Sequence, residues 1–281
     1  MSLSKKFENV IFEKFKTKNE ILDNTLIKFI CFALKNISGV ENFENFCKTK
    51  FKNLNVSENI DDIFRALEIK PYVYYNDIEN LKNQYIIVSN HPTGPMDGIF
   101  IPKVFNLFNL KGKILGDDIM TGMDHMKDSY MGLSLRLEGK SRITQLRNLK
   151  KEILNGSTLG IFPAGSVSHF DVKRKQICDN EWNPGFIDIA KSNNLDILPV
   201  YIDANLSILH YIFKYIYDDI ASLRLFKEAS SFVEKNKGKT IEIYVGSPIS
   251  VSTLEPTDEN AQKIKEICEN LMFQNYTKIN Y

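Results

Sequence analysis

A histidine and an aspartate stand close together in one short, turn-like stretch of this sequence. His91 and Asp97 belong to the segment Asn-His-Pro-Thr-Gly-Pro-Met-Asp-Gly at residues 90–98. Histidine titrates near neutral pH, so its imidazole can take a proton from a hydroxyl group. A carboxylate bound to the other ring nitrogen would fix the tautomer and stabilise the imidazolium. Since no serine or cysteine nucleophile is paired with His91 in the sequence, the activated hydroxyl would belong to a substrate.

A second interpretation of the same two residues requires no chemistry. Asp97 could cap the helix that follows it, and His91 could pack against the loop. The pair taken alone is compatible with both interpretations.

The neighbouring segments explain how the pair would be positioned. The apolar run at residues 85–88 predicts a buried strand, and residues 99–109 predict a helix. Proline and glycine between them fix the backbone of a turn and leave it accessible. His91 and Asp97 would then lie at the carboxyl end of a strand, where open α/β sheets bind their ligands.

Strand-like and helix-like segments alternate along the rest of the chain. Further strands are expected at residues 72–75, 113–116, 158–162, 196–202 and 240–245, and further helices at 145–155, 185–192 and from 259 onward. The last helix would bury one face, formed by Ile264, Ile267, Leu271 and Met272. This order predicts an α/β fold, with a sheet flanked by helices over residues 71–281 and a helical extension over residues 1–70.

A loop rich in methionine and polar side chains follows the strand expected at 113–116. Its potential metal ligands match no binding loop in their spacing: Asp117, Asp118, Asp124 and His125. We therefore predict a solvated loop near the site, with methionines that mainly fill gaps in the packing.

Composition excludes several classes of function. A formal net charge of +1 gives no electrostatic case for a nucleic-acid partner. The cysteines are scattered without metal-ligand spacing, which favours free thiols in a reducing cytoplasm: Cys31, Cys47, Cys178 and Cys268. The first residues lack the apolar core of a signal peptide, and no run approaches the 18 or so apolar residues of a transmembrane helix.

Four blocks of this sequence resemble, in order, the motifs of the lysophosphatidic acid acyltransferase-like superfamily. The first is Asn90-His91 followed by Asp97; most members have four residues between histidine and aspartate, and this chain has five. The longer spacing is similar to that of a bacterial, hemolysin-like subgroup. The other blocks are Phe-Pro-Ala-Gly at 162–165, Ile-Leu-Pro-Val at 197–200 and Tyr-Val-Gly-Ser-Pro-Ile at 244–249.

The resemblance implies a glycerophospholipid acyltransferase-like fold and an O-acyltransferase activity. The acyl donor would be acyl-CoA or acyl-carrier protein, and the acceptor a lysophospholipid similar to lysophosphatidic acid. His91 would be the general base and Asp97 would orient it, with backbone amides around Gly94 and Gly165 stabilising the oxyanion. The reaction would need neither a metal nor an organic cofactor.

The resemblance also implies a set of substrate-binding residues. They come from the first and third motifs and from the region of the second: Asn90, Gly94, Arg136, Arg142, Phe162, Pro163, Gly165 and Ser166. An arginine fork suits a phosphate, but this chain does not reproduce the usual second motif, so surface charge is an equal explanation for Arg136 and Arg142. Ala164 replaces the usual glutamate, which weakens any inference about a glycerophosphate-type acceptor.

Two alternatives remain open at this point. The motifs also resemble acyltransferases that complete amino-acid lipids such as ornithine lipids, whose acceptor is a 3-hydroxyacyl group and needs no phosphate clamp. A protein of another class, an idle lipid-binding protein on the same fold, is disfavoured because His91 and Asp97 are both retained.

A lipid acceptor implies a place at a membrane surface. We expect a cytoplasmic protein, peripheral on the inner face of the cytoplasmic membrane. Two apolar segments could lie on the bilayer or pack inside the protein, at residues 26–34 and 206–217.

Overall fold

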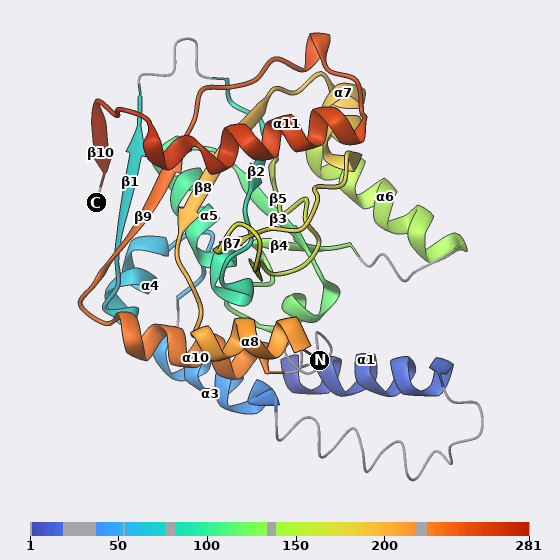
Figure 1. Ribbon diagram of the computed structural model, residues 1–281. Coiled ribbons are helices and arrows are strands. Elements are labelled where there is room, and N and C mark those ends of the chain that lie inside the picture. The colour runs from blue at the N-terminus through green and yellow to red at the C-terminus, as the bar shows by residue number, and fades with distance from the viewer. Residues whose placement is uncertain are drawn as a thin grey trace.

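The computed structural model describes residues 2–18, 38–52, 54–76, 82–133, 139–216 and 224–280. Its centre is an eight-stranded sheet with strand order β10-β1-β9-β8-β2-β5-β3-β4 (Figure 1). The strands of this sheet are β1 (Lys70–Tyr75), β2 (Ile86–Ser89), β3 (Gly112–Gly116), β4 (Tyr130–Gly132), β5 (Thr158–Ile161), β8 (Ile197–Asp203), β9 (Thr240–Val245) and β10 (Lys278–Asn280).

The middle of the sheet is parallel. Strand β2 pairs in parallel with β5 on one side and with β8 on the other, and β3 and β4 continue in the same direction. Strand β9 runs antiparallel to β8 and parallel to β1. The carboxyl ends of β2, β5 and β8 therefore meet at one edge of the sheet.

Helices cover both faces of this sheet (Figure 1). Their bounds are α1 (Leu3–Lys18), α3 (Val40–Lys50), α4 (Ile60–Leu67), α5 (Asp97–Leu107), α6 (Gly139–Leu154), α7 (Gly185–Asn193), α8 (Ile208–Ile216), α10 (Leu225–Asn236) and α11 (Asp258–Glu269). One core lies among α1, α3, α4, α5 and α10, and the other among α6, α7 and α11. Successive side chains of β2 point to opposite faces of the sheet and so contribute to both cores: Ile87 faces the first core, and Ile86 and Val88 face the second. The α/β sheet flanked by helices is confirmed.

The N-terminal helices share a core with the sheet. Phe7 of α1 and Phe43 of α3 both pack against Phe226 of α10, with ring centroids 5.8 and 5.5 Å apart. The division of the chain at residue 70 stays a prediction, and the apolar segment 26–34 lies outside the described residues.

Two local expectations are wrong in part. In the loop after β3, Asp117 and Asp124 are exposed as expected, but His125 is buried, because α1 and α3 pack over this segment. Met120, Met123 and Met126 are buried in the first core, in agreement with a gap-filling role. In α11, Ile267 is exposed, and the buried stripe consists of Ala261, Ile264, Lys265 and Cys268. The expected stripe followed the large apolar residues. The observed stripe includes the small residues Ala261 and Cys268, on a helix that packs against β8.

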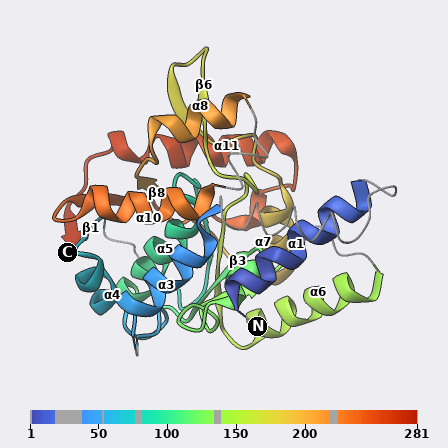
Figure 2. The same cartoon turned by 90° about the horizontal axis from the view of Figure 1, so that it is seen from below.

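A two-stranded hairpin stands apart from the main sheet. It consists of β6 (His169–Asp171) and β7 (Gln176–Cys178), paired antiparallel. Seen from below, this hairpin lies beside α8 at the periphery of the molecule (Figure 2).

Candidate active site

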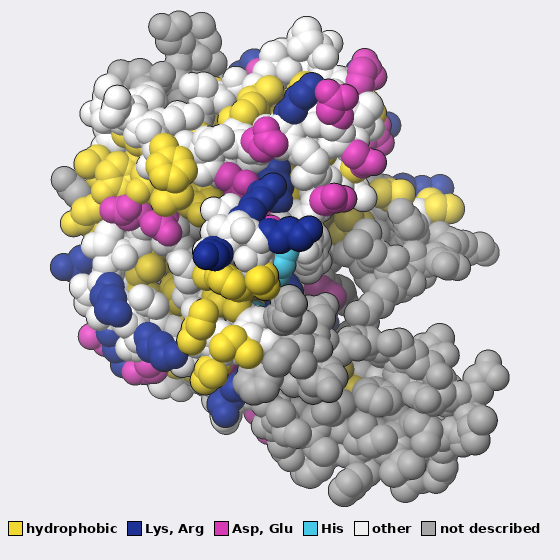
Figure 3. All heavy atoms as spheres, viewed as in Figure 1, with side chains coloured by type: hydrophobic (Ala, Val, Ile, Leu, Met, Phe, Trp, Pro, Cys, Tyr) yellow, Lys and Arg dark blue, Asp and Glu magenta, His cyan; other side chains and the backbone are white. Residues whose placement is uncertain are grey.

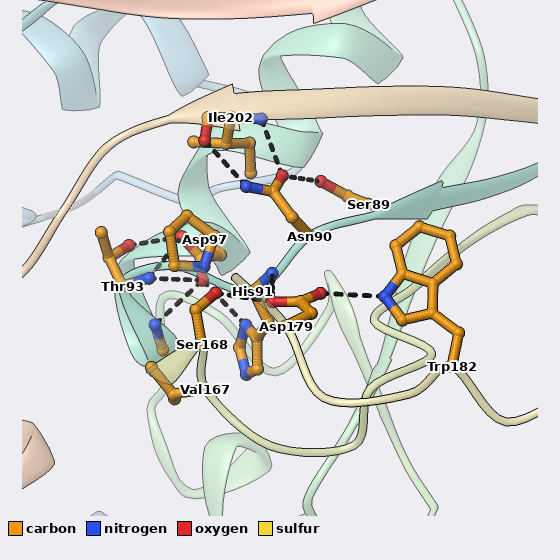
Figure 4. Close-up of polar contacts among 12 residues, drawn as sticks. Ser89, Asn90, His91, Thr93, Asp97, Val167, Ser168, Asp179, Trp182 and Ile202 are labelled. Atoms are coloured by element: carbon orange, nitrogen blue, oxygen red, sulfur yellow. Dashed lines mark hydrogen bonds and ion pairs between the residues drawn. The ribbon is translucent and has the colours of Figure 1, made fainter. Parts of the chain in front are cut away.

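His91 and Asp97 face each other in the loop that leaves the central strand β2. His91 Nδ1 lies 2.8 Å from Asp97 Oδ2, the Asp97 side chain is fully buried and the imidazole is partly exposed (Figure 4). A carboxylate can only accept a hydrogen bond, so Nδ1 carries the proton and Nε2 is left as the base.

The Asp97 carboxylate is held by the turn that precedes it. Oδ2 accepts hydrogen bonds from the backbone N–H groups of Thr93 and Gly94, both at 2.9 Å, and the Thr93 hydroxyl donates to Oδ1. No side chain caps the N-terminus of α5. The helix-capping interpretation of Asp97 is therefore wrong, because its oxygens face back toward His91 and the turn.

Asn90 joins the catalytic loop to the neighbouring strand. Its side-chain amide donates to Ile202 O at 2.9 Å and accepts from Ile202 N at 2.8 Å. This buried amide extends the pairing of β2 with β8 by one position beyond the end of β2. The structure thus gives Asn90 a positioning contact, and its role toward a substrate stays a prediction.

The third-motif turn places an aromatic ring on the histidine. Phe162 stacks on the His91 imidazole with ring centroids 4.3 Å apart and planes 18° from parallel. Pro163 O accepts from Asn183 N at 3.1 Å, and Ser166 Oγ accepts from Asn180 Nδ2 at 2.8 Å. Parallel pairing of β2 and β5 brings this turn beside the histidine loop.

The two glycines proposed beside the oxyanion both have positive φ, 67° at Gly94 and 64° at Gly165. Gly94 N donates to Asp97 Oδ2, and Gly165 N donates to Phe162 O at 3.0 Å. Their own N–H groups are therefore engaged within the two turns, and an oxyanion donor is to be sought among the neighbouring amides.

The two arginines expected near a phosphate are not tested by the structure. Arg136 lies outside the described residues. Arg142 belongs to the first turn of α6, and its side chain is likewise outside the described part of the structure.

Sequence reasoning missed Asp179, a buried carboxylate just after the β6–β7 hairpin. Asp179 Oδ1 accepts from His91 N at 3.2 Å and from Ser168 Oγ at 2.5 Å, and Oδ2 accepts from Trp182 Nε1 at 3.0 Å (Figure 4). Burial raises the pKa of Asp179, and the three donors oppose that rise. Its spacing from His91 follows no motif, so the only available signal was an aspartate three residues before the single tryptophan.

The main chain of His91 is thus held on both sides by the segment around the hairpin. Asp179 accepts from its N–H, and its carbonyl accepts from Ser168 N at 2.9 Å. Lys265 of α11 donates to Asp179 O at 2.8 Å and fixes that segment to the second core. Among the described residues, no group of three or more histidines, cysteines, aspartates or glutamates could hold a metal ion.

Comparison with known proteins decides the family. An acyltransferase family model (Acyltransf_2) matches residues 16–276. The chain belongs to this acyltransferase family. Membership of the lysophosphatidic acid acyltransferase-like superfamily, expected from the four motifs, is confirmed. The protein is an acyltransferase enzyme.

Two curated relatives of this acyltransferase share one name with each other. A lyso-glycine lipid O-acyltransferase of Bacteroides thetaiotaomicron is 26% identical over 84% of this chain and 86% of its own length. Another, of Phocaeicola vulgatus, is 23% identical over 84% of both chains. Among solved structures, the acyltransferase is similar to the 1-acyl-sn-glycerophosphate (LPA) acyltransferase PlsC from Thermotoga maritima, at 15% identity and a TM-score of 0.48 over 96% of this chain and 97% of that one.

Proposed function

We propose that this acyltransferase moves a fatty acyl group from a thioester donor to the hydroxyl of a lysolipid with an amino-acid head group. The observation that supports the reaction is the His91–Asp97 pair, which leaves one imidazole nitrogen as a base on a partly exposed ring. The acceptor hydroxyl loses its proton to His91 Nε2 while its oxygen attacks the thioester carbonyl. The new C–O bond forms, the C–S bond breaks, and the imidazolium returns the proton to the departing thiolate.

The relatives and one residue support this acceptor class. Both curated relatives are lyso-glycine lipid O-acyltransferases, which supports the amino-acid-lipid alternative. Ala164 stands where most of the superfamily has a glutamate, which points away from a glycerophosphate-type acceptor. Lysophosphatidic acid remains the second candidate, because the motif order is that of the superfamily as a whole. Acyl-CoA and acyl-carrier protein are both retained as donors.

The roles of the site residues are part of this proposal. His91 is the base and Asp97 its orienting carboxylate. Phe162 fixes the orientation of the imidazole ring by stacking on it. The turn of Pro163, Gly165 and Ser166 borders the acceptor. We further place the enzyme peripherally on the inner face of the cytoplasmic membrane; among the described helices, none combines the length and apolar character needed to cross a bilayer.

The test is acyl transfer by the purified protein. Labelled acyl-CoA and acyl-carrier protein are offered with lyso-glycine lipid, lyso-ornithine lipid or lysophosphatidic acid, and products are identified by mass spectrometry. We expect product with an amino-acid lysolipid and a loss of at least about 10²-fold in His91→Gln, on the usual scale of general-base catalysis. Product with lysophosphatidic acid alone would overturn the acceptor class, and full activity of a folded His91→Gln would overturn the mechanism.

A further inference from the structure

The outer face of α8 is apolar and open to solvent. Ile208, Leu209 and Ile212 are 62, 56 and 48% exposed, and their spacing places them on one side of the helix. The inner side carries the buried Tyr211 and His210. Three large aliphatic side chains on one short helix make a contiguous surface of a kind that usually contacts a partner or a membrane.

The tip of the neighbouring hairpin is cationic. Lys173, Arg174 and Lys175 are exposed, beside an exposed Val172. Asp171 is the single carboxylate of this tip; it accepts from the backbone N–H groups of Lys173 and Arg174, at 2.8 and 3.1 Å, and so fixes the turn. Three cations against one carboxylate leave the tip positively charged.

The two features form one surface, which we call the docking face: Val172, Lys173, Arg174, Lys175, Ile208, Leu209 and Ile212. Strand β6 contacts α8, and the two elements lie side by side when the molecule is viewed from below (Figure 2). On the space-filling view, hydrophobic side chains lie directly beside lysine and arginine side chains near the middle of the visible side of the molecule (Figure 3).

The docking face adjoins the catalytic loop through α8. The Lys214 ammonium donates to Val167 O, one residue before the Ser168 that donates to His91 O. Tyr211 donates its hydroxyl to Pro92 O at 3.4 Å. The helix that exposes the apolar face is therefore bonded to the residue after the histidine and to the segment that donates to the histidine carbonyl.

We propose that the docking face seats the enzyme on an anionic lipid bilayer, with the aliphatic side chains of α8 in the interface and the hairpin cations against the lipid head groups. Apolar and basic side chains on one surface are the combination that interfacial elements use. The inference deepens the proposed function, because a lysolipid acceptor would enter from the bilayer beside His91. The cations alone would also suit an acidic carrier protein, but the adjoining aliphatic face favours a bilayer.

Helix α6 supplies a matched control surface. Ile143 and Leu146 are 49 and 47% exposed, and Lys150 and Lys151 are exposed on the same helix. In Figure 1, α6 projects from the opposite side of the molecule from β10, and its buried side chains Leu149 and Ile153 belong to the second core. It has the composition of the docking face without its position.

The experiment measures flotation of the full-length protein with vesicles of phosphatidylcholine, with or without about a third phosphatidylglycerol. Lys173→Glu/Lys175→Glu is expected to lose at least about 10-fold in affinity for the anionic vesicles, since each interfacial lysine contributes about fivefold. Leu209→Ser/Ile212→Ser should weaken binding to both vesicle types. The α6 variants Ile143→Ser/Leu146→Ser and Lys150→Glu/Lys151→Glu should bind as wild type does.

Activity separates the docking face from the active site. The docking-face variants should retain wild-type transfer to a short-chain lyso-glycine lipid dispersed as monomers and lose transfer to the same head group presented in anionic vesicles. Unchanged vesicle binding in these variants, or a loss confined to the α6 variants, overturns the inference. Unchanged vesicle binding with a raised KM for acyl-carrier protein also overturns it and assigns the face to the donor. Failure of wild type to acylate any acceptor rejects the proposed function, while the flotation result still judges the docking face.

Discussion

At the scale of single residues, the position of His91 is fixed mainly by residues far along the chain. Its ring is held by Asp97 and Phe162, and its main chain by Asp179 and Ser168. Proton transfer depends on geometry within a few tenths of an ångström, so residues that never touch a substrate should still affect the rate.

The Asp97 carboxylate should matter through the tautomer of His91. In Asp97→Asn, the amide can donate to Nδ1, which moves the ring proton to Nε2 and removes the base. We expect kcat to fall by at least about 10²-fold, with a smaller change in KM. Steady-state kinetics on protein with a wild-type circular dichroism spectrum tests this; an unchanged kcat would remove Asp97 from the mechanism.

Asp179 is a positioning residue, so replacing its carboxylate should lower both the stability of the protein and kcat. In Asp179→Asn, one carboxylate oxygen becomes an NH2 group that can only donate. The remaining oxygen can serve either His91 N and Ser168 Oγ or Trp182 Nε1, but not both sides. We therefore expect a stability loss of about 1–3 kcal/mol and a lower kcat. Trp182→Phe is the control, because it removes one donor to Asp179 and leaves the contact with His91. A kcat loss equal in both variants at matched stability would assign Asp179 a structural role only.

At the scale of elements, the start of α5 depends on a glycine. A Cβ built on Gly98 would lie 1.4 Å from the buried Tyr130 hydroxyl, so β4 packs directly on the first turn of this helix. Gly98→Ala should displace that turn and the adjoining Asp97, with a cost of about 1–3 kcal/mol and a loss of activity. Gly185→Ala, in the first turn of α7, meets its nearest atom only at 3.0 Å and should cost less in thermal unfolding. An equal cost at both positions would contradict this account.

The packing of the N-terminal helices should depend on pH through His125. Its ring lies 4.9 Å from the Phe51 ring, and burial lowers its pKa to about 4, against the smaller opposing effects of Asp124 and Glu44. An unfolded histidine titrates near 6.5. The unfolded chain therefore binds the proton first on acidification, so this contribution to stability is complete above about pH 6.5 and is lost as the pH falls toward 4.

Replacing this histidine should flatten that dependence. In His125→Phe the melting temperature is expected to fall less between pH 6.5 and 4 than in wild type, with a difference on the order of 2–3 kcal/mol in the free energy of unfolding. Thermal melts at several pH values measure it. Parallel curves for the two proteins would show that His125 is not the group that titrates.

At the scale of the whole molecule, local signals predicted most of the fold. Strand β2, the turn at 90–98 and β5 agree with expectation to within two residues, because apolar runs and proline–glycine turns act on their own neighbours. The His91–Asp97 contact was predictable for the same reason: its partners lie on one turn.

Contacts between distant segments could not be predicted in this way. Asp179 bonds a residue 88 positions away, and no periodicity in the sequence relates the two. Burial of His125 depends on α1 and α3, which pack over its loop from the N-terminal end of the chain. Phe162 was expected to border a substrate, whereas its stacking on His91 required knowledge of how β5 pairs with β2.

The pairing of β2 bears on the order in which the protein assembles during synthesis. Asn90 needs Ile202, 112 positions later, and β8 supplies one complete side of β2. A nascent chain that ends before β8 therefore has an apolar strand with one unpaired edge, which invites aggregation. Since domains fold as units during synthesis, the catalytic loop can order only after more than two thirds of the chain has been made, and earlier truncations should be insoluble rather than merely inactive.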